Sequence, residues 1–190
     1  MAYMDLVLAS QSPRRAELMR NAGFLFQIRV RSVEEVRRTG EPPRDYAMRL
    51  AREKANAAWE DREEIVLGAD TIVLLGEEVL EKPAHEEDAR TMLAALSGRE
   101  HTVVTGICLR HPQGETIDCE STRVWFSRLD DEEIAAYVAS GEPMDKAGAY
   151  AIQGLASKFV ERIEGCYFNV MGLPVPRFYR HWKRLHFPCG

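Results

Sequence analysis

The sequence predicts an α/β protein in which helices flank a mixed, twisted sheet, within a single domain over residues 1–190. Short apolar runs of strand length alternate along the chain with longer segments that carry helix signals. Because the alternation does not follow regular strand–helix–strand units, the sheet should contain strands of both directions. With 45% hydrophobic residues, a chain of 190 residues can bury a sizeable core without a disulfide or a structural metal.

Eight short runs, either apolar throughout or alternating, predict the strands. Asp70 and Thr71 divide the third run from the fourth, so that Asp70 is expected at the C-terminal end of a buried strand. Gly76-Glu77-Glu78 then turns the chain into a hairpin. The runs cover residues 6–9, 24–30, 65–69, 72–75, 102–109, 122–126, 150–152 and 159–163.

Five segments carry the signals that begin and end helices. Ser12 can cap the first helix, with Pro13 in its first turn, and Asp130 with Glu133 three residues later has the pattern of a capping box. Glycines follow three of the segments and mark their ends. The helices are expected over residues 13–22, 43–58, 84–96, 130–141 and 177–185.

Charge and cysteine content exclude several classes of function. A net charge of −5 and a pI near 5.6 argue against binding to duplex nucleic acid or to an anionic membrane surface, although a local basic cluster can still bind a small anion. The four cysteines, at positions 108, 119, 166 and 189, form no Cys-x-x-Cys pair and predict neither a zinc site nor a disulfide framework. No signal sequence or membrane span is evident, so the expected location is the cytoplasm.

The segment from Ser10 to Arg15 is the strongest candidate for an anion site. It lies between a buried strand and a helix start, where free backbone N–H groups and the helix dipole attract anions. The hydroxyls of Ser10 and Ser12 and the guanidinium groups of Arg14 and Arg15 add donors for phosphate oxygens. The alternative that stays open is a capped helix whose arginines are solvated.

Lys54 stands on the apolar face of the second predicted helix. Ala47, Leu50, Ala51 and Lys54 follow the i, i+3, i+4, i+7 spacing of one helix face. A lysine in that position either extends its ammonium to the rim or meets an anion. The arginines of the same helix, at positions 44, 49 and 52, are expected to be surface charges.

Asp70 is the best candidate for a catalytic group. A carboxylate at the edge of an α/β sheet can bind a divalent metal or accept a proton from water; its alternative is an Asx-turn. Lys82 closes the hairpin that Asp70 opens, so the two can share a pocket or form an ordinary surface ion pair. Glu34 and Glu35, in the loop after the second predicted strand, can supply a second carboxylate to bind a metal.

Gln153 is the last candidate that residue chemistry suggests. It lies in a glycine-rich segment and offers a donor and an acceptor, which suits reading the edge of a nucleobase, although the segment can also be a simple flexible turn. A basic anion site, strand-end carboxylates and a second lysine together favour metal-assisted phosphoryl transfer to water. None of the five histidines has metal or triad spacing.

A set of ordered motifs closely resembles the Maf family of nucleoside triphosphate pyrophosphatases, from about residue 6 to 176. Any one motif is common, whereas the ordered set is specific. The motifs are Leu8-Ala9-Ser10-Gln11-Ser12-Pro13-Arg14-Arg15, Leu50-Ala51-Arg52-Glu53-Lys54-Ala55, Gly68-Ala69-Asp70-Thr71, Glu81-Lys82-Pro83, Leu96-Ser97-Gly98-Arg99, Asp145-Lys146-Ala147-Gly148-Ala149-Tyr150, Ile152-Gln153-Gly154 and Asn169-Val170-Met171-Gly172-Leu173-Pro174.

The resemblance implies a fold of two lobes with a central substrate cleft and hydrolysis of a nucleoside triphosphate to the monophosphate and pyrophosphate. It implies a divalent cation, Mg²⁺ or Mn²⁺, held by Glu35 and Asp70, with Asp70 as the proton acceptor for the attacking water. It assigns phosphate handling to the basic and hydroxyl positions, Ser10, Arg14, Arg15, Lys54 and Lys82. A homodimer is compatible with the family, although no segment is diagnostic of an interface.

Three positions separate subgroups of the family, and here they read Arg14, Thr71 and Gln153. That combination is similar to the branch that acts on dTTP and UTP, including modified pyrimidine nucleotides. Two alternatives stay open: a pyrophosphatase for 7-methyl-GTP or noncanonical purine nucleotides, and a nucleotide-binding regulator of cell division, through the family's association with septum formation. A structural protein without a small-molecule site is disfavoured by the carboxylate, lysine and arginine constellation.

Overall fold

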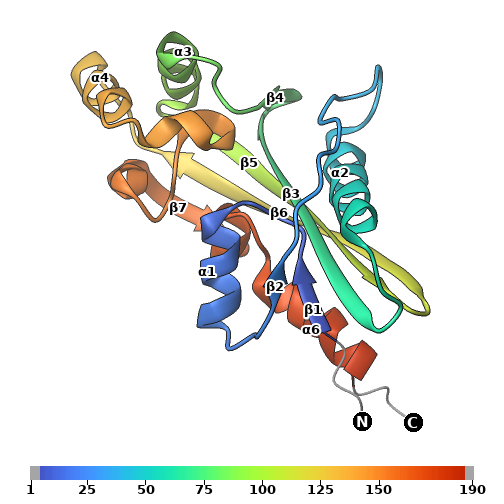
Figure 1. The fold of residues 1–190 in the computed structure, drawn as a ribbon. Helices are drawn as coiled ribbons and strands as arrows, with labels where there is room; N and C mark the ends of the chain where they lie inside the picture. Colours follow the sequence, from blue (N-terminus) through green and yellow to red (C-terminus); the bar gives the residue numbers. More distant parts are fainter. Residues whose placement is uncertain (1–4, 187–190) are drawn as a thin grey trace. The chain divides into compact units, whose positions relative to one another are not determined.

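The computed structural model describes residues 5–186 and forms one seven-stranded sheet with helices around it (Figure 1). The strands are β1 (Asp5–Leu8), β2 (Gln27–Ile28), β3 (Glu64–Leu75), β4 (Glu78–Leu80), β5 (Glu100–His111), β6 (Gly114–Phe126) and β7 (Val160–Glu164). The α-helices are α1 (Pro13–Asn21), α2 (Pro43–Ala58), α3 (Glu86–Leu96), α4 (Asp131–Ala139), α5 (Tyr167–Val170) and α6 (Val175–His186). Short 3-10 segments are η1 (Glu142–Asp145), η2 (Ala147–Ala149) and η3 (Leu155–Phe159). Among the described helices, none is long and apolar enough to span a bilayer.

The sheet is mixed, as the sequence predicts. Its order is β2-β1-β3-β5-β6-β7, with β4 paired to β3. β1 runs parallel to β2 and β3, whereas β3 with β4 and β6 with β7 form antiparallel pairs. The hairpin turn after Leu75 is also confirmed, because Leu75 pairs with Glu78 across it.

Four strand predictions were wrong in extent or kind. The strand expected over residues 122–126 begins eight residues earlier, at Gly114. Asp70 does not end a strand, because β3 continues through it to Leu75. The β-branched residues before it, Ile65 and Val66, and after it, from Thr71 to Val73, favour extended backbone on either side of Asp70. The strand expected over residues 24–30 shortens to β2, both of whose residues are exposed. Residues 150–152 form no strand, and a turn follows in which the Gly154 N–H donates to the Ala151 carbonyl.

Helix ends follow the predicted local signals closely. The Ser12 hydroxyl accepts from the Arg15 N–H at 3.4 Å and caps α1. At α4, the Asp130 and Glu133 side chains accept from each other's backbone N–H at 2.8 and 3.1 Å, which completes the capping box. α5 and the 3-10 segments have no side-chain cap, although Pro143 stands at the start of η1.

The described residues fall into two compact units, and β3, β5 and β6 each contribute to both. The first unit comprises residues 5–70, 105–120 and 172–186; the second comprises residues 71–104 and 121–171. In the first unit, the small-residue face of α2 packs on the sheet through Ala51, Ala55 and Ala58, all fully buried. Gly68 of β3 and Gly106 of β5 permit this close approach, because a Cβ on either would lie 2.1 or 2.4 Å from a carbonyl oxygen of α2.

An aromatic cluster fills the core of the second unit, beside α3 and α4, which lie side by side (Figure 1). The rings of Phe126 and Tyr150 meet edge to face, with centroids 4.8 Å apart. Both also contact the ring of His101, whose Nε2 lies 2.8 Å from the Tyr150 hydroxyl. The His101 Nδ1 is buried and has no hydrogen-bond partner among the described residues.

His101 should make the stability of the protein depend on pH. Burial lowers the pKa of His101 to about 4, from an ordinary value of 6.5. Between about pH 6.5 and 4, His101 is therefore protonated in the unfolded chain but neutral in the folded protein. The free energy of unfolding that is present at neutral pH should decrease as the pH falls from 6.5 towards 4. The loss should approach about 3 kcal/mol, since each pKa unit corresponds to about 1.4 kcal/mol.

Urea unfolding of the wild type and of His101→Gln at pH 7 and pH 4.5 measures this contribution. The variant should lose clearly less stability between the two pH values than the wild type loses. His85→Gln, at a histidine whose side chain is 64% exposed, is the control. It also removes the cap of α3, in which His85 Nδ1 accepts from the Asp88 N–H at 3.2 Å, so it should be less stable at both pH values, but the difference between them should follow the wild type. Parallel pH dependence in all three proteins would contradict the role of His101.

Candidate active site

Asp70, Lys54 and Glu35 come together in the first compact unit. The Lys54 Nζ donates to Asp70 Oδ1 at 2.6 Å and lies 2.7 Å from Glu35 Oε1. Asp70 and Lys54 are largely enclosed, with side chains 10% and 14% exposed, whereas the Glu35 side chain is 47% exposed. The ammonium of Lys54 thus lies between two carboxylates, one buried in the sheet and one at the surface. Lys54 therefore meets carboxylates of the same chain, and its binding of a substrate anion stays a prediction.

Helix α2 holds both Lys54 and the loop that carries Glu35. Ala47, Leu50 and Ala51 of the predicted apolar face are buried, which directs Lys54 of the same face towards β3. The Tyr46 hydroxyl donates to the Glu35 carbonyl at 3.1 Å, and the Arg49 guanidinium donates to the Val36 carbonyl at 2.9 Å. α2 therefore positions one carboxylate through the loop and supplies the cation that meets both.

Arg49 is not the surface charge that the sequence indicates. Its side chain is 15% exposed and pairs with Glu41 through two hydrogen bonds of 2.6 and 2.8 Å. These bonds lower the pKa of Glu41 to about 2, so the pair stays charged at every physiological pH. Together with Tyr46, Arg49 anchors the Glu35 loop. Arg49 also pairs with Glu53, four residues along the same helix, at 3.1 Å. Its other partners, Glu41 and Val36, belong to a loop without secondary structure, and no local pattern reveals them.

The predicted anion site is built around Arg15. Its Nε donates to the Gly172 carbonyl at 2.8 Å, and its Nη1 donates to the Ser10 hydroxyl at 3.0 Å. That hydroxyl also accepts from the Ser12 N–H at 3.2 Å, so Ser10 joins the guanidinium to the start of α1. Arg14, the next residue on the helix, is half-buried. Arg15 is therefore fixed in place rather than solvated, and Gly172 is a partner that sequence reasoning did not identify.

Electrostatics connect this arginine with the catalytic candidate. Burial raises the pKa of Asp70 above its ordinary value, and the positive charges of Lys54 and Arg15 counteract part of that rise. Burial likewise lowers the pKa of Arg15, which the charge of Asp70 partly offsets. A carboxylate with raised proton affinity and two cations beside it is suited to accept a proton from water near a phosphate.

Asp70 and Glu35 have the chemistry of ligands for a divalent cation. Their carboxylates already face one cation, the Lys54 ammonium, at 2.6 and 2.7 Å. Mg²⁺ is commonly held by one or two carboxylates, with water and substrate phosphates completing its shell. In residues 5–186, no group of three or more His, Cys, Asp or Glu side chains is arranged to hold a metal ion. The two residues therefore fit an ion whose other ligands come from water and from the phosphates of a substrate, rather than an ion that is bound by protein side chains alone.

The remaining predicted site residues belong to the second compact unit. Thr71 is half-buried in β3, while Lys82, just after β4, and Gln153, in the turn before η3, are exposed. The Gly148 N–H donates to the Glu81 carbonyl at 3.1 Å, which ties the segment before Gln153 to the segment of Lys82. The shared pocket expected for Asp70 and Lys82 stays a prediction, because the strand pairing ends at Val73 with Leu80.

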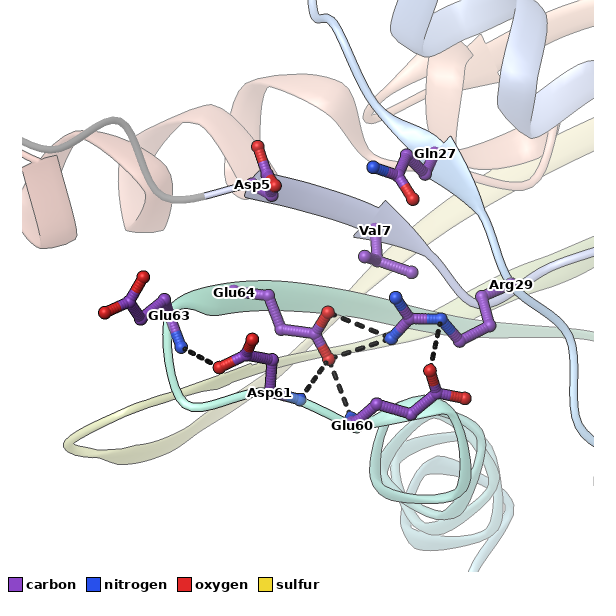
Figure 2. Close-up of a pocket in the computed structure, with 8 residues that line it drawn as sticks. All are labelled: Asp5, Val7, Gln27, Arg29, Glu60, Asp61, Glu63 and Glu64. Carbon is purple, nitrogen blue, oxygen red and sulfur yellow. Dashed lines mark hydrogen bonds and ion pairs between the residues drawn. The ribbon is translucent and has the colours of Figure 1, made fainter.

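A separate acidic cavity of about 320 Å³ opens in the first unit, at the start of β1 and β3 (Figure 2). Two of its lining residues form an ion pair, in which the Arg29 Nη1 donates to both Glu64 oxygens at 2.9 Å. Glu64 also accepts from the N–H groups of Glu60 and Asp61. None of the candidate site residues lines it; the lining residues are Asp5, Val7, Gln27, Arg29, Glu60, Asp61, Glu63 and Glu64.

Comparison with known proteins assigns the chain to a family. The dTTP/UTP pyrophosphatase of Koribacter versatilis is 53% identical over 182 residues, which cover 95% of this chain and 94% of that protein. The dTTP/UTP pyrophosphatase of Anaeromyxobacter dehalogenans (strain 2CP-C) is 51% identical over 187 residues, or 96% and 95% of the two chains. The solved structure of the Staphylococcus aureus Ham1 protein aligns at 14% identity with a TM-score of 0.47, over 82% of this chain and 90% of that one. The model of the Maf-like protein family matches residues 5–185, so the chain belongs to the Maf family.

Proposed function

We propose that this protein hydrolyses dTTP and UTP, and modified pyrimidine nucleotides of the same shape, to the monophosphate and pyrophosphate. The names of relatives that are about half identical over nearly the whole chain support the substrate and the reaction. The observation that carries the proposal is the position of the Lys54 ammonium between the carboxylates of Asp70 and Glu35. It places a cation suited to a phosphate next to a buried carboxylate suited to accept a proton.

Asp70 is the residue that accepts the proton of the attacking water. Its enclosed position raises its pKa, and the positive charges of Lys54 and Arg15 counteract part of that rise. Arg15, held by Ser10 and Gly172, can offer its charge to a phosphate without first losing side-chain freedom. Lys54, Arg14 and Lys82 add positive charge for the triphosphate and for the leaving pyrophosphate. Asp70 and Glu35 would hold a divalent cation, which would neutralise further charge at the phosphates.

Thr71 and Gln153 are the residues proposed to contact the nucleoside. The carboxamide of Gln153 can donate to one polar atom of a pyrimidine edge and accept from the next. In this proposal the enzyme acts on free nucleotides in the cytoplasm, with neither duplex nucleic acid nor a membrane as a partner, and a homodimer is compatible with it.

Product analysis tests the proposal. The purified protein is incubated with Mg²⁺ or Mn²⁺ and, separately, with dTTP, UTP, CTP, GTP, ATP, ITP and 7-methyl-GTP. Monophosphate and pyrophosphate should appear chiefly from dTTP and UTP, and a chelator should abolish the reaction. Turnover chiefly of 7-methyl-GTP or ITP would overturn the substrate assignment but keep the reaction. Nucleotide binding without any product would overturn the assignment of an enzymatic activity and favour a nucleotide-binding regulatory protein.

A further inference from the structure

The turn that carries Gln153 is held from both sides by two residues outside every motif described above. Ala151 and Leu155 flank Gln153, each two positions away, and the Gly154 N–H closes the turn by donating to the Ala151 carbonyl at 3.0 Å. Gln153 is exposed in this turn, whereas Ala151 and Ile152 before it are buried. The turn thus presents one polar side chain from a fixed support.

Tyr137 of α4 holds the near side of the turn. Its hydroxyl accepts from the Ala151 N–H at 3.2 Å and donates to Glu142 Oε1 at 2.8 Å. The Tyr137 ring is 3% exposed and packs edge to face on Phe159, with centroids 5.5 Å apart. Because the ring is fixed in the core, the hydroxyl is a rigid anchor rather than an adaptable surface contact.

Glu142 of η1 holds the far side. Its second carboxylate oxygen accepts from the Leu155 N–H at 3.1 Å, so one carboxylate joins Tyr137 to the end of the turn. Gly154 leaves the space for it, because a Cβ there would lie 2.4–2.6 Å from the carboxylate atoms. The Glu142 carbonyl accepts from Lys146 Nζ at 2.7 Å, which fixes the backbone of η1 as well.

We propose that Tyr137 and Glu142 are positioning residues that set the base preference of the substrate site by clamping the turn of Gln153. A glutamine carboxamide can present its donor and acceptor in either order by rotating about its last bond, so by itself it pairs with a uracil edge or a cytosine edge. Its preference then depends on where the backbone holds it. The inference rests on the proposed function, because it takes Gln153 as the residue that meets the base.

The test measures base preference in binding and in turnover separately. Dissociation constants are determined for the α,β-methylene analogues of UTP and CTP, which resist cleavage, and kcat and KM are determined for UTP and CTP. Tyr137→Phe removes the hydrogen bonds of the hydroxyl with the Ala151 N–H and with Glu142 and keeps the ring. It should reduce the UTP-over-CTP preference about fivefold or more, through KM and the dissociation constant, with kcat for UTP within about twofold. Gly154→Ala, which displaces the Glu142 carboxylate, should lower the preference in the same way.

Ser97→Ala is the matched control. The Ser97 hydroxyl also makes two backbone hydrogen bonds in the second unit, to the N–H and carbonyl of Leu129, but it does not touch the turn. It should lower thermal stability and leave the preference unchanged. An unchanged preference in both Tyr137→Phe and Gly154→Ala overturns the clamp, as does a wild type that binds the two analogues equally. A wild type that binds with a preference but does not turn over refutes the proposed function alone, and the binding ratios of the variants still decide the clamp.

Discussion

Replacing Asp70 with asparagine is expected to lower kcat for dTTP at least about a hundredfold, while dTTP binds within a few-fold of the wild-type affinity. A positioned general base contributes about 10²–10⁴ to a rate, and asparagine has the same shape but cannot take up the proton of water. The size of the effect follows from the enclosure of Asp70, whose pKa is raised by burial and whose carboxylate touches Lys54 at 2.6 Å. Steady-state rates of product formation measure kcat, and equilibrium binding measures the affinity for dTTP.

The same variant separates proton transfer from simple metal binding. If Asp70 acts chiefly by holding the metal, raising the Mg²⁺ concentration tenfold should recover much of the rate; as a base, it leaves a defect that excess metal does not repair. Asp45→Asn, an exposed carboxylate on the same helix as Lys54, is the control and should keep wild-type turnover. Full activity in Asp70→Asn, or recovery by metal, would remove Asp70 from the role of proton acceptor.

Features coded by local signals could be predicted from the sequence. The caps of α1 and α4 agree with the structure, because a capping hydroxyl or carboxylate acts on a backbone N–H three residues away. The bounds of α2, which has no side-chain cap, also agree, because Pro43 fits the first turn of a helix. The predicted end of a strand at Asp70 was wrong because strand pairing depends on the backbone. A single polar residue interrupts an apolar pattern but not a strand, since the backbone of β3 pairs regardless of that side chain.

The candidate site was predictable in its residue types and not in its contacts. Lys54 was singled out by its place on an apolar face, but nothing near it in the chain reveals Glu35 and Asp70 as its two partners. The same holds for Arg15 and the Gly172 carbonyl, which are 157 positions apart. Such pairs arise when packing brings distant segments together, and a single sequence contains no periodicity that encodes them.

Gly68→Ala should lower the free energy of unfolding by at least about 3 kcal/mol, considerably more than Gly76→Ala. A Cβ at this position would lie 2.1 Å from the Ala51 carbonyl oxygen and 2.7 Å from the Ala55 nitrogen. Both are backbone atoms of α2, so no side chain can move aside and the helix itself must shift. Urea unfolding at neutral pH measures the loss.

Activity should fall further than stability explains, because Lys54 lies between Ala51 and Ala55 on the helix that must move. A shift of α2 separates the Lys54 Nζ from Asp70 Oδ1, now 2.6 Å apart, and changes the charge that Asp70 experiences. Gly76→Ala provides the control: Gly76 has a φ of +65°, and a Cβ there would meet no described atom within 4 Å, so the change should cost about 1 kcal/mol through backbone strain and leave kcat unchanged. If Gly68→Ala instead matched Gly76→Ala in both stability and kcat, α2 would not be seated on β3 as described, and the position of Lys54 would not depend on that glycine.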